Sequence, residues 1–448
     1  MAQPGNLEIK TLTVYSLDAT GSITDIDDLS DQYLQCMLMQ SIFDSSIRLN
    51  IVMSESKGSL TRFNKVGFQG QEFVKCVITT PDHRTIDLDF WVENIEGIEF
   101  SDKQQSASLV LSCVTKENLI SVYQNVNQAF KSTYPKAINS IFKDYIVAPL
   151  KTNTMLGPHF GTATTTPSII FDEIDDQYTQ QFIIPGLQPF GAINWCAKRT
   201  FGNSSQERNV GLKNGSNTWI FYQDCDDYQY RNLEYLIANN KKKAKTLIYG
   251  AMDAEGDAKK DNWDVKIKNL YDIEGMDNKH NSNHGIYANK VRAIDYFKKT
   301  YRDVGYNYVN DFEGFETLGK RTVIDKSFAD AFVKSNWTEL FFKDTTKLGG
   351  ANGQAYEYVF GHRRGWYHQL FNMGCKITLE GNLDWKPGEV INMDVPEQSA
   401  TTVEIGDRVD TKFSGHWFVG TVMHSWSSSS HETTLELLKD SVVNATGA

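Results

Sequence analysis

The C-terminal part of the chain contains two strand-rich segments, NLDWKPGEVINMDV at 382–395 and FSGHWFVGTVMHSWSSSSHETTLELLKD at 413–440. The dipeptide Pro387–Gly388 is typical of a tight turn and predicts that the strand Glu389–Met393 follows it. We expect a second strand at His416–Trp426, whose Val, Thr, Phe and Trp residues suit a pleated surface. A third expected strand, Thr433–Leu438, alternates polar residues with leucine. Together the three strands predict the closing meander of a small β-barrel.

The short motifs in these segments follow a particular order. A Pro-Gly turn leads into a strand with a central isoleucine, a Ser-Gly pair introduces an aromatic strand, and a Thr-Thr-Leu-Glu-Leu strand ends in Lys-Asp-Ser. In this order the motifs resemble the C-terminal barrel of the baseplate hub proteins of contractile-tailed, T-even-like bacteriophages. The residues that carry the resemblance are Leu383, Pro387, Gly388, Ile391, Ser414, Gly415, Trp417, Thr433, Thr434, Leu435, Glu436, Leu437, Lys439, Asp440 and Ser441.

The composition is that of a folded protein with several domains. With 448 residues, of which 40% are hydrophobic and 23% charged, the chain can form roughly two to four domains. The 45 basic and 56 acidic residues give a net charge of −11, which argues against a dedicated nucleic-acid-binding protein, because such a protein needs a basic surface. An acidic wall is compatible with a channel through which DNA passes without binding.

The cysteines and the N-terminus indicate where the protein is made. The six cysteines are scattered and form no CxxC pair, which predicts reduced, mostly buried thiols in a protein made in a cytosol. The first residues, MAQPGNLEIK, contain no apolar signal region, and no run approaches the roughly 18 apolar residues of a membrane-spanning helix. We therefore expect neither secretion through a signal peptide nor membrane insertion.

The segment 5–115 predicts an all-β domain, which we assign to residues 1–115. Short strand-like runs alternate with turn residues at the spacing typical of a sandwich or closed barrel. The runs FNKVGFQGQEFVKCVI and DLDFWVENIEG also resemble the first barrel of the hub family. The clearest expected strands are Lys10–Leu17, Ser46–Met53, Glu72–Thr79, Ile86–Asn94 and Ala107–Thr115.

Helix signals begin after this domain and predict an α/β domain at 116–261. Thr115 is an expected N-cap, and apolar residues follow it at helical spacing. These apolar residues are Leu119, Tyr123, Val126 and Phe130. A second helix is expected to begin at Pro135 and to end at Pro149, because proline suits the first turn of a helix and interrupts its interior.

Three further features divide the middle of the chain. A helix is expected from Pro189 to about Phe201, followed by a loop and the strand Thr218–Gln223, an order that resembles the second domain of the hub family. An insertion at 152–185 begins with a segment rich in Thr, Gly and Pro, which is typical of a loop. The basic run Lys241–Lys245 and the polar residues after it favour a domain boundary near 240–262.

The region 262–448 predicts a second barrel that is divided in the sequence. Its clearest early strands are Val265–Leu270 and Gly285–Ile294, and the wording HGIYANKVRAID resembles the strand that leads into the second barrel of the hub family. Residues 311–355 lack clear periodicity and predict a long insertion, after which Tyr356–Phe371 is expected to form a helix. The two halves of this barrel must therefore meet in space.

One segment matches the spacing of a phosphate-binding loop. Gly314–Lys320 reads G-x-x-x-x-G-K, and that chemistry requires a compact run of backbone N–H groups and a hydroxyl group for Mg²⁺. Arg321 replaces the hydroxyl residue, and no buried strand precedes the segment. We interpret it as a solvated loop.

Histidines and carboxylates form three further candidate groups. His280 and His284 have the i, i+4 spacing of a metal site, but the Asn-Ser-Asn between them favours a loop. The residues of the final strands that could converge are His416, His424 and His431, and we interpret them as ordinary strand histidines. The acidic run Phe171–Asp176 could supply carboxylates for glycoside hydrolysis, but adjacent acids usually belong to a solvated loop.

The tryptophans are interpreted as core residues, some of which serve subunit contacts. They are Trp91, Trp195, Trp219, Trp366, Trp385, Trp417 and Trp426. We predict no catalytic residue, no cofactor site and no metal site, and we expect that the chain is not an enzyme.

The expected fold class is α+β, with two similar β-barrel (tube) domains, an intervening α/β domain and a long insertion. The resemblance implies a homotrimer whose barrels form a pseudo-sixfold ring. It implies a tail tube protein above the ring, a central spike protein below it, baseplate wedge proteins around it, and DNA that passes through the lumen during ejection. The protein would be a structural virion protein of the tail baseplate, assembled in the host cytoplasm.

Two other functions stay open at this point. The chain could be a tail-associated cell-wall hydrolase, or a carbohydrate-binding module that uses surface aromatic residues. A hub-like role in a related injection machine shares its mechanism with the phage hub, and the sequence does not separate the two.

Overall fold

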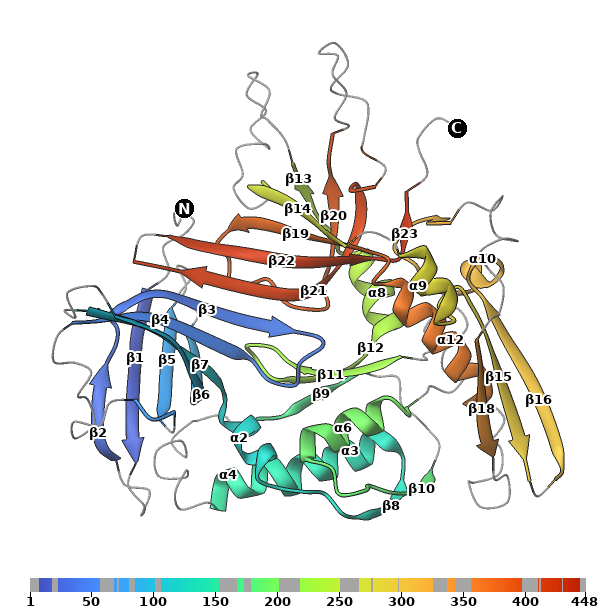
Figure 1. Cartoon of the computed structure of the whole chain (residues 1–448), viewed down its shortest axis with the longest axis horizontal. Helices are drawn as coiled ribbons and strands as arrows, with labels where there is room; N and C mark the ends of the chain where they lie inside the picture. The colour runs from blue at the N-terminus through green and yellow to red at the C-terminus, as the bar shows by residue number, and fades with distance from the viewer. Residues whose placement is uncertain are drawn as a thin grey trace, which may run out of the picture.

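The structure is a computed structural model. It describes residues 8–17, 23–56, 68–70, 72–79, 85–100, 106–152, 167–172, 179–200, 218–249, 266–274, 277–296, 298–324, 337–343, 356–396, 410, 412–428 and 430–443. The architecture is mixed α+β with mostly antiparallel sheets, in agreement with the coarse fold class that the sequence predicts. Figure 1 shows two groups of strands in contact, a layer of helices beside them and a strand arm at one end of the molecule.

The largest sheet has 13 strands and contains both strand groups. The N-terminal strand group comprises β1 (Glu8–Leu17), β2 (Ile23–Asp28), β3 (Tyr33–Ser41), β4 (Arg48–Ser56), β5 (Phe73–Thr79), β6 (Thr85–Phe100) and β7 (Ser106–Thr115). Its strands follow the order β2-β1-β5-β6-β7-β4-β3, and all of these pairs are antiparallel. All five strands that the sequence predicts in this region are present. Their ends agree within two residues, except that β4 ends three residues later and β6 six residues later than expected.

The C-terminal strand group closes on itself. It comprises β13 (Lys245–Ile248), β14 (Asn269–Glu274), β19 (Met373–Glu380), β20 (Val390–Asp394), β21 (Gly415–Trp426) and β22 (His431–Lys439). The strands follow the order β14-β19-β22-β21-β20-β13. The strand group is closed into a barrel by the contact between β13 and the residues just before β14. Ile248 forms a β-bridge with Lys266, and the Ile267 N–H donates to the Ile248 carbonyl at 2.9 Å. The predicted closing meander is therefore confirmed as β20, β21 and β22.

Two early strand predictions in this region need correction. The strand expected at Val265–Leu270 begins at Asn269, and Val265 lies outside the described residues. The strand expected at Gly285–Ile294 is present as β15 (Ala288–Asp295), but it pairs with β16 (Thr300–Asn307) and β18 (Trp337–Lys343) instead of joining the C-terminal group. The early strand that closes the C-terminal group is β13, which was not predicted from the sequence.

In the sequence, the helical layer lies between the two groups. Its elements are α2 (Lys116–Val122), β8 (Ala129–Ser132), α3 (Tyr134–Phe142), the π-helical turn η2 (Lys143–Val147), α4 (Ala148–Thr152), β9 (Ile169–Phe171), β10 (Gln180–Ile183), α6 (Pro189–Ala197), β11 (Trp219–Gln223), β12 (Tyr228–Asn232) and α8 (Leu233–Lys241). Two of these strands, β9 and β10, fall within the insertion expected at 152–185, of which 153–166 and 173–178 lie outside the described residues. The helices pack around an apolar and aromatic core that includes Ile138, Phe142 and Ile193.

The helix predictions here were only partly correct. The helix capped by Thr115 ends at Val122, because the Val126 N–H bonds to the Leu187 carbonyl at 2.7 Å and β8 pairs with β10. Pro149 does not end the second helix. The Ala148 N–H donates a hydrogen bond to the carbonyl of Lys143, five residues earlier, which makes this turn wider than an α-helical turn. The chain then continues into α4, where Pro149 occupies the first turn and its missing N–H leaves no helical hydrogen bond unmade.

The remaining elements lie at one end of the molecule and share a hydrophobic core with α8, β20 and β21. They are α9 (Asn278–Asn283), α10 (Tyr308–Asp311), the 3₁₀ turn η4 (Phe312–Gly314), the pair β17 (Arg321–Thr322) and β23 (Ser441–Val442), and α12 (Tyr356–Gln369), which the sequence predicts well. The three-stranded sheet β16-β15-β18, which we call the arm, has α12 against one face. Residues 325–336 and 344–355 of the expected insertion lie outside the described residues.

The domain boundaries stay predictions. The strand pairs nevertheless show that β13, which precedes residue 262, pairs with β20 of the C-terminal group. The helix predicted from Pro189 to about Phe201 ends at Ala197. In the described part of the chain, no helix combines the length and the apolar character needed to cross a membrane.

Candidate functional site

The junction between the two strand groups is a single strand, β21. Its first half pairs with β20, from Val390↔Phe418 to Met393↔Gly415. Its second half pairs with β3 of the N-terminal group, from Thr421↔Ser41 to Trp426↔Cys36. The change of partner falls at a bulge at Gly420, where an added Cβ would lie 3.1 Å from Leu438 and 3.2 Å from Phe43. Because one strand serves both groups, they form one continuous sheet (Figure 1).

Side chains reinforce the backbone pairing at this junction. Ser41 Oγ and Thr421 Oγ1 share a buried hydrogen bond of 3.0 Å, and Gln35 Nε2 donates to Ser425 Oγ at 2.7 Å. Beyond β3, the Ile42 N–H donates to the Gly420 carbonyl at 3.0 Å. The two groups are therefore held by polar contacts along the whole shared segment, which favours a fixed orientation between them.

A histidine pair lies beside the junction. His424 on β21 and His431 on β22 are both buried, and their ring centroids are 5.8 Å apart. His424 Nδ1 contacts Thr433 Oγ1 at 3.1 Å. Burial lowers the pKa of His424 to about 3, with a further contribution from His431, and burial lowers the pKa of His431 to about 4. Both imidazoles are therefore neutral in the folded protein at neutral pH.

The surroundings of the pair explain this burial. Trp426 packs into the core of the N-terminal group, whereas Val422, four residues earlier on the same strand, packs into the core of the C-terminal group. The pair thus lies where the two cores meet. Gly381 passes directly over His431, so that an added Cβ would lie 2.1 Å from the imidazole ring. Within the described residues, the Nε2 atoms of both histidines have no hydrogen-bond partner.

The third histidine of the final strands does not join this pair. His416 is half-buried at the other end of β21, opposite Asn392. Lys439 is buried near that end of β21. Its Nζ donates to the carbonyls of Ser414 at 2.6 Å and Lys412 at 3.1 Å, and it lies 4.9 Å from the centre of the Trp417 ring. Burial lowers the pKa of Lys439 to about 8. The sequence analysis treated Lys439 only as part of a motif.

The segment with phosphate-loop spacing is a packed connection. The Leu318 N–H donates to Asp440 Oδ1 at 3.1 Å, and the Gly319 N–H donates to Ser441 Oγ at 2.6 Å. Leu318 and Phe315 are buried, so the expectation of a solvated loop is wrong. Because these N–H groups bond to the side chains of Asp440 and Ser441, which follow β22, they are not directed at an anion.

The other candidate groups have structural partners. His280 lies on α9, not in the expected loop, because the Asp277 side chain accepts a hydrogen bond from the His280 N–H at 2.8 Å and caps the helix. His284 is the C-cap residue that follows this helix. Asp172 is buried and accepts bonds from Arg231 Nη1 at 2.8 Å and from the Asn232 N–H at 2.7 Å. The acids at 173–176 lie outside the described residues. Among the residues that the structure describes, no three His, Cys, Asp or Glu side chains are grouped as metal ligands.

The aromatic and cysteine predictions agree with the structure in most cases. The tryptophans that are buried are Trp219, Trp366, Trp385, Trp417 and Trp426. Trp91 and Trp195 are partly buried, and the Arg199 guanidinium lies 3.7 Å above the Trp195 ring. All six cysteines are free thiols, and all except the half-buried Cys225 are buried, as predicted.

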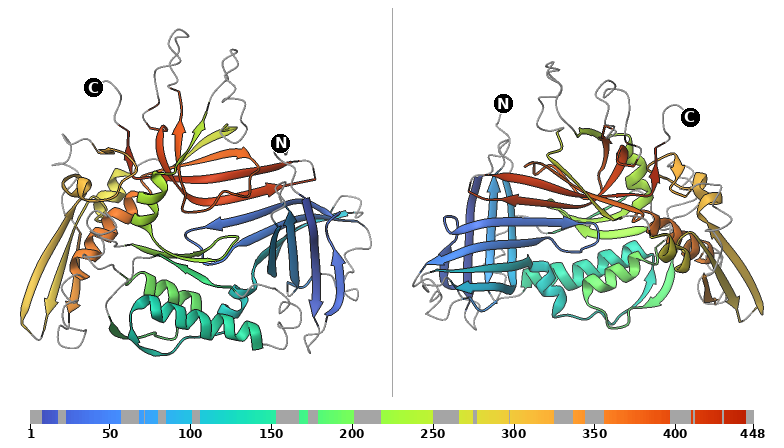
Figure 2. Two further views of the ribbon diagram at one scale, coloured as in Figure 1. Left: turned by 180° about the vertical axis from the view of Figure 1, so that it is seen from behind. Right: turned by 45° about the horizontal axis from the view of Figure 1, so that its top comes forward.

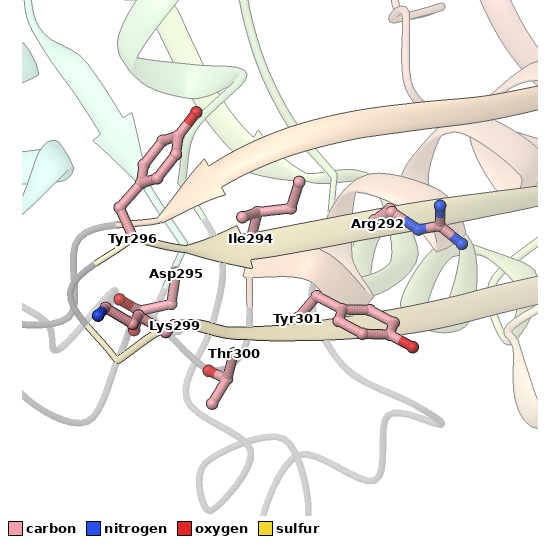
Figure 3. Close-up of a pocket in the computed structure, with 7 residues that line it drawn as sticks. All are labelled: Arg292, Ile294, Asp295, Tyr296, Lys299, Thr300 and Tyr301. Atoms are coloured by element: carbon pink, nitrogen blue, oxygen red, sulfur yellow. The ribbon is translucent and has the colours of Figure 1, made fainter.

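The arm exposes aromatic side chains at its tip. Figure 3 shows its tip, where Tyr296 and Tyr301 project from the ends of β15 and β16 beside a hollow of about 490 Å³. Arg292 forms two 2.8 Å hydrogen bonds with Asp303, and its guanidinium lies 5.8 Å from the Tyr301 ring centre. The sequence pattern places only the strand Gly285–Ile294 here, as part of the second barrel, and does not predict this surface.

Comparison with known proteins supports the class that the fold indicates. No family model matches the sequence, and no curated protein matches it. Two solved structures share the fold over nearly the whole length. The tail protein from Neisseria meningitidis MC58 has a TM-score of 0.53 at 12% identity, with 96% of this chain and 96% of that chain covered. The 43 kDa tail protein of prophage MuSo2 from Shewanella oneidensis has a TM-score of 0.50 at 8% identity, with 96% and 99% covered.

The fold of the chain is therefore that of phage tail proteins. At identities of 12% and 8%, the likeness concerns the fold alone. It supports the resemblance to baseplate hub proteins that the C-terminal motifs indicate.

Proposed function

We propose that the chain is the structural subunit of a baseplate hub. Each strand group is a tube barrel, and three subunits form a closed ring in which the barrels occupy pseudo-sixfold positions. The observation that supports this most directly is the sharing of β21, which joins two strand groups edge to edge in one 13-stranded sheet. A rigid pair of barrels repeated three times is suited to join a sixfold tube to a threefold spike.

The proposal includes the position of the ring in the tail. The tail tube protein binds above the ring, the central spike protein below it and the baseplate wedge proteins around it, in a virion assembled in the host cytoplasm. DNA passes through the lumen during ejection without specific binding. The net charge of −11 is compatible with this part, because a wall that shares this charge repels phosphate groups.

The particle mass tests the ring. Light scattering coupled to size-exclusion chromatography is expected to give about three times the 50.8 kDa of one chain, and negative-stain images are expected to show threefold symmetry with a central hole. A monomer at micromolar concentration, or a solid particle, would contradict the proposal.

We further propose that the chain has no catalytic activity. Two buried carboxylates, Asp172 in the helical layer and Asp440 after β22, accept structural hydrogen bonds. A zymogram on peptidoglycan is expected to show no clearing by the purified chain. Clearing would favour a tail-associated cell-wall hydrolase, and binding on a glycan array would favour a carbohydrate-binding module.

A further inference from the structure

The arm is basic, in contrast to the rest of the chain. Residues 288–307 contain five cationic side chains and two carboxylates, which gives a net charge of +3, while the whole chain carries −11. The remaining residues therefore carry −14. Lys298, Lys299 and Arg302 are exposed at the tip, whereas the Asp303 carboxylate is bonded to Arg292. The tip thus presents mainly positive charge to the solvent.

The outer face of the arm also exposes apolar groups. The inner face contacts α12 through Asn289 and Val291, whereas Tyr301 and Leu340 on the outer face are 73% and 57% exposed. The hollow at the tip is lined by parts of Ile294, Tyr296 and Tyr301 (Figure 3). In the described part of the chain, β16 and β18 each pair with β15 alone. Exposed aromatic residues and open strand edges on one projecting element are typical of a protein interface.

The opposite end of the molecule has the complementary character. Residues 23–34 contain four aspartates and neither Lys nor Arg. β2 ends the 13-stranded sheet, and Ile26 on β2 is 57% exposed. Leu34, near the start of β3 after the turn that follows β2, is 52% exposed. Asp28 and Asp31 are also exposed, and hydrogen bonds from Ser30 lower the pKa of Asp28, which keeps it charged. We call this surface, from Ile26 to Leu34, the acidic edge.

The two surfaces lie at opposite ends of the longest axis of the molecule. Figure 1 and the reverse view in Figure 2 both place β2 at one end and β16 at the other. Within one subunit, the arm therefore does not reach the acidic edge. Between two copies, the same placement produces a head-to-tail contact, which closes into a ring when the rotation between subunits allows it.

We propose that the arm of one subunit docks on the acidic edge of the next copy of the chain. Lys298, Lys299 and Arg302 face Asp28 and Asp31 of the neighbour, and the hollow at the tip receives an exposed apolar side chain of the acidic edge. This inference rests on the proposed ring and identifies the contact that closes it. Three elongated subunits joined end to end enclose a central hole. The opposite charges orient the encounter, and the apolar groups supply buried area.

Charge reversal in the full-length protein tests the contact. In sedimentation velocity, Lys298→Glu with Lys299→Glu is expected to shift the trimer toward monomer, with a dissociation constant raised about tenfold or more. Asp28→Lys with Asp31→Lys is expected to do the same. In an equal mixture of the two variants, both contacts between unlike chains are complementary, so a mixed trimer has two complementary contacts and one repulsive contact and is expected to recover only in part. The combined variant, with all four changes, is expected to recover the trimer. The matched control is Lys242→Glu with Lys243→Glu, an exposed lysine pair elsewhere that should leave the trimer unchanged.

The outcomes separate the two proposals. A monomeric unaltered protein would remove both the ring and this contact. A trimer that survives charge reversal in the arm would overturn the contact and leave the ring in place. Dissociation without recovery in the combined variant would also overturn the pairing of these two surfaces. Circular dichroism of each variant verifies that the loss of the trimer is not a loss of folding.

Discussion

The two strand groups have the same kind of sheet but different interiors. The core of the N-terminal group consists of apolar side chains and cysteines, such as Leu12, Ile51 and Cys113. The C-terminal group also buries histidine and lysine side chains, at His424, His431 and Lys439, whereas the described strands of the N-terminal group bury neither. Apolar burial stabilises a core at any pH, whereas a buried ionisable group makes stability depend on its protonation. The comparison therefore predicts that the two groups respond differently to acid, although they share β21.

The largest expected effect is acid destabilisation of the C-terminal group. His424 and His431 have folded pKa values of about 3 and about 4, below the ordinary value of 6.5. The unfolded chain therefore binds more protons, so the stability from the neutral pair is complete above pH 6.5 and is lost as the pH falls toward 4. The loss by pH 4 should be on the order of 5 kcal/mol.

Denaturant unfolding of the unaltered protein and of His424→Leu, at several pH values from 7 to 4, measures this effect. The variant should show a smaller decrease in stability with falling pH. Hydrogen exchange should locate the early loss of protection in β19 and β22 and not in β5 and β6. Equal slopes for the two proteins would contradict the role of the pair.

The next effect concerns the strand that the two groups share. Trp426 belongs to β21 but packs into the N-terminal core, so Trp426→Ala should lower the free energy of unfolding by about 3–5 kcal/mol. Hydrogen exchange in this variant should increase in β3 and β4 of the N-terminal group. An increase in exchange confined to β19 and β22 would show that Trp426 does not stabilise the N-terminal group.

A smaller effect is expected where the chain passes over the histidine pair. An added Cβ at Gly381 would lie 2.1 Å from the His431 ring, so Gly381→Ala should cost about 1–3 kcal/mol through overpacking. The matched control is Gly305→Ala on β16, where the nearest atom would lie 3.8 Å away. Thermal unfolding of both variants compares them, and equal melting temperatures would contradict close packing at Gly381.

The smallest effect is expected in the arm. Tyr301 is exposed within the subunit, so Tyr301→Ala should change the free energy of unfolding of the monomer by less than about 0.5 kcal/mol. Denaturant unfolding at a concentration below the association range measures it. A larger loss would show that the outer face of the arm contributes to the fold of its own subunit.

Local signals explain which elements could be predicted. The Pro-Gly turn, the aromatic strand after Gly415 and the Thr/Leu alternation each depend on residues close in sequence, and β20, β21 and β22 appear where expected. The five N-terminal strands were predicted for the same reason. One helix error has a distant cause, because the Val126 N–H bonds to the Leu187 carbonyl instead of extending the helix. The other has a local cause, because proline usually interrupts a helix and the π-helical turn accommodates Pro149 here.

The sequence by itself determined the strand-rich character of the chain, its buried thiols and tryptophans, its net charge and its resemblance to hub proteins, because these depend on composition and local pattern. Only the tertiary structure decided that β21 serves both strand groups, that His424 and His431 meet while His416 does not, and that β15 belongs to the arm. Strand pairing joins residues far apart in the chain, such as Cys36 and Trp426, and a local pattern carries no information about such a partner.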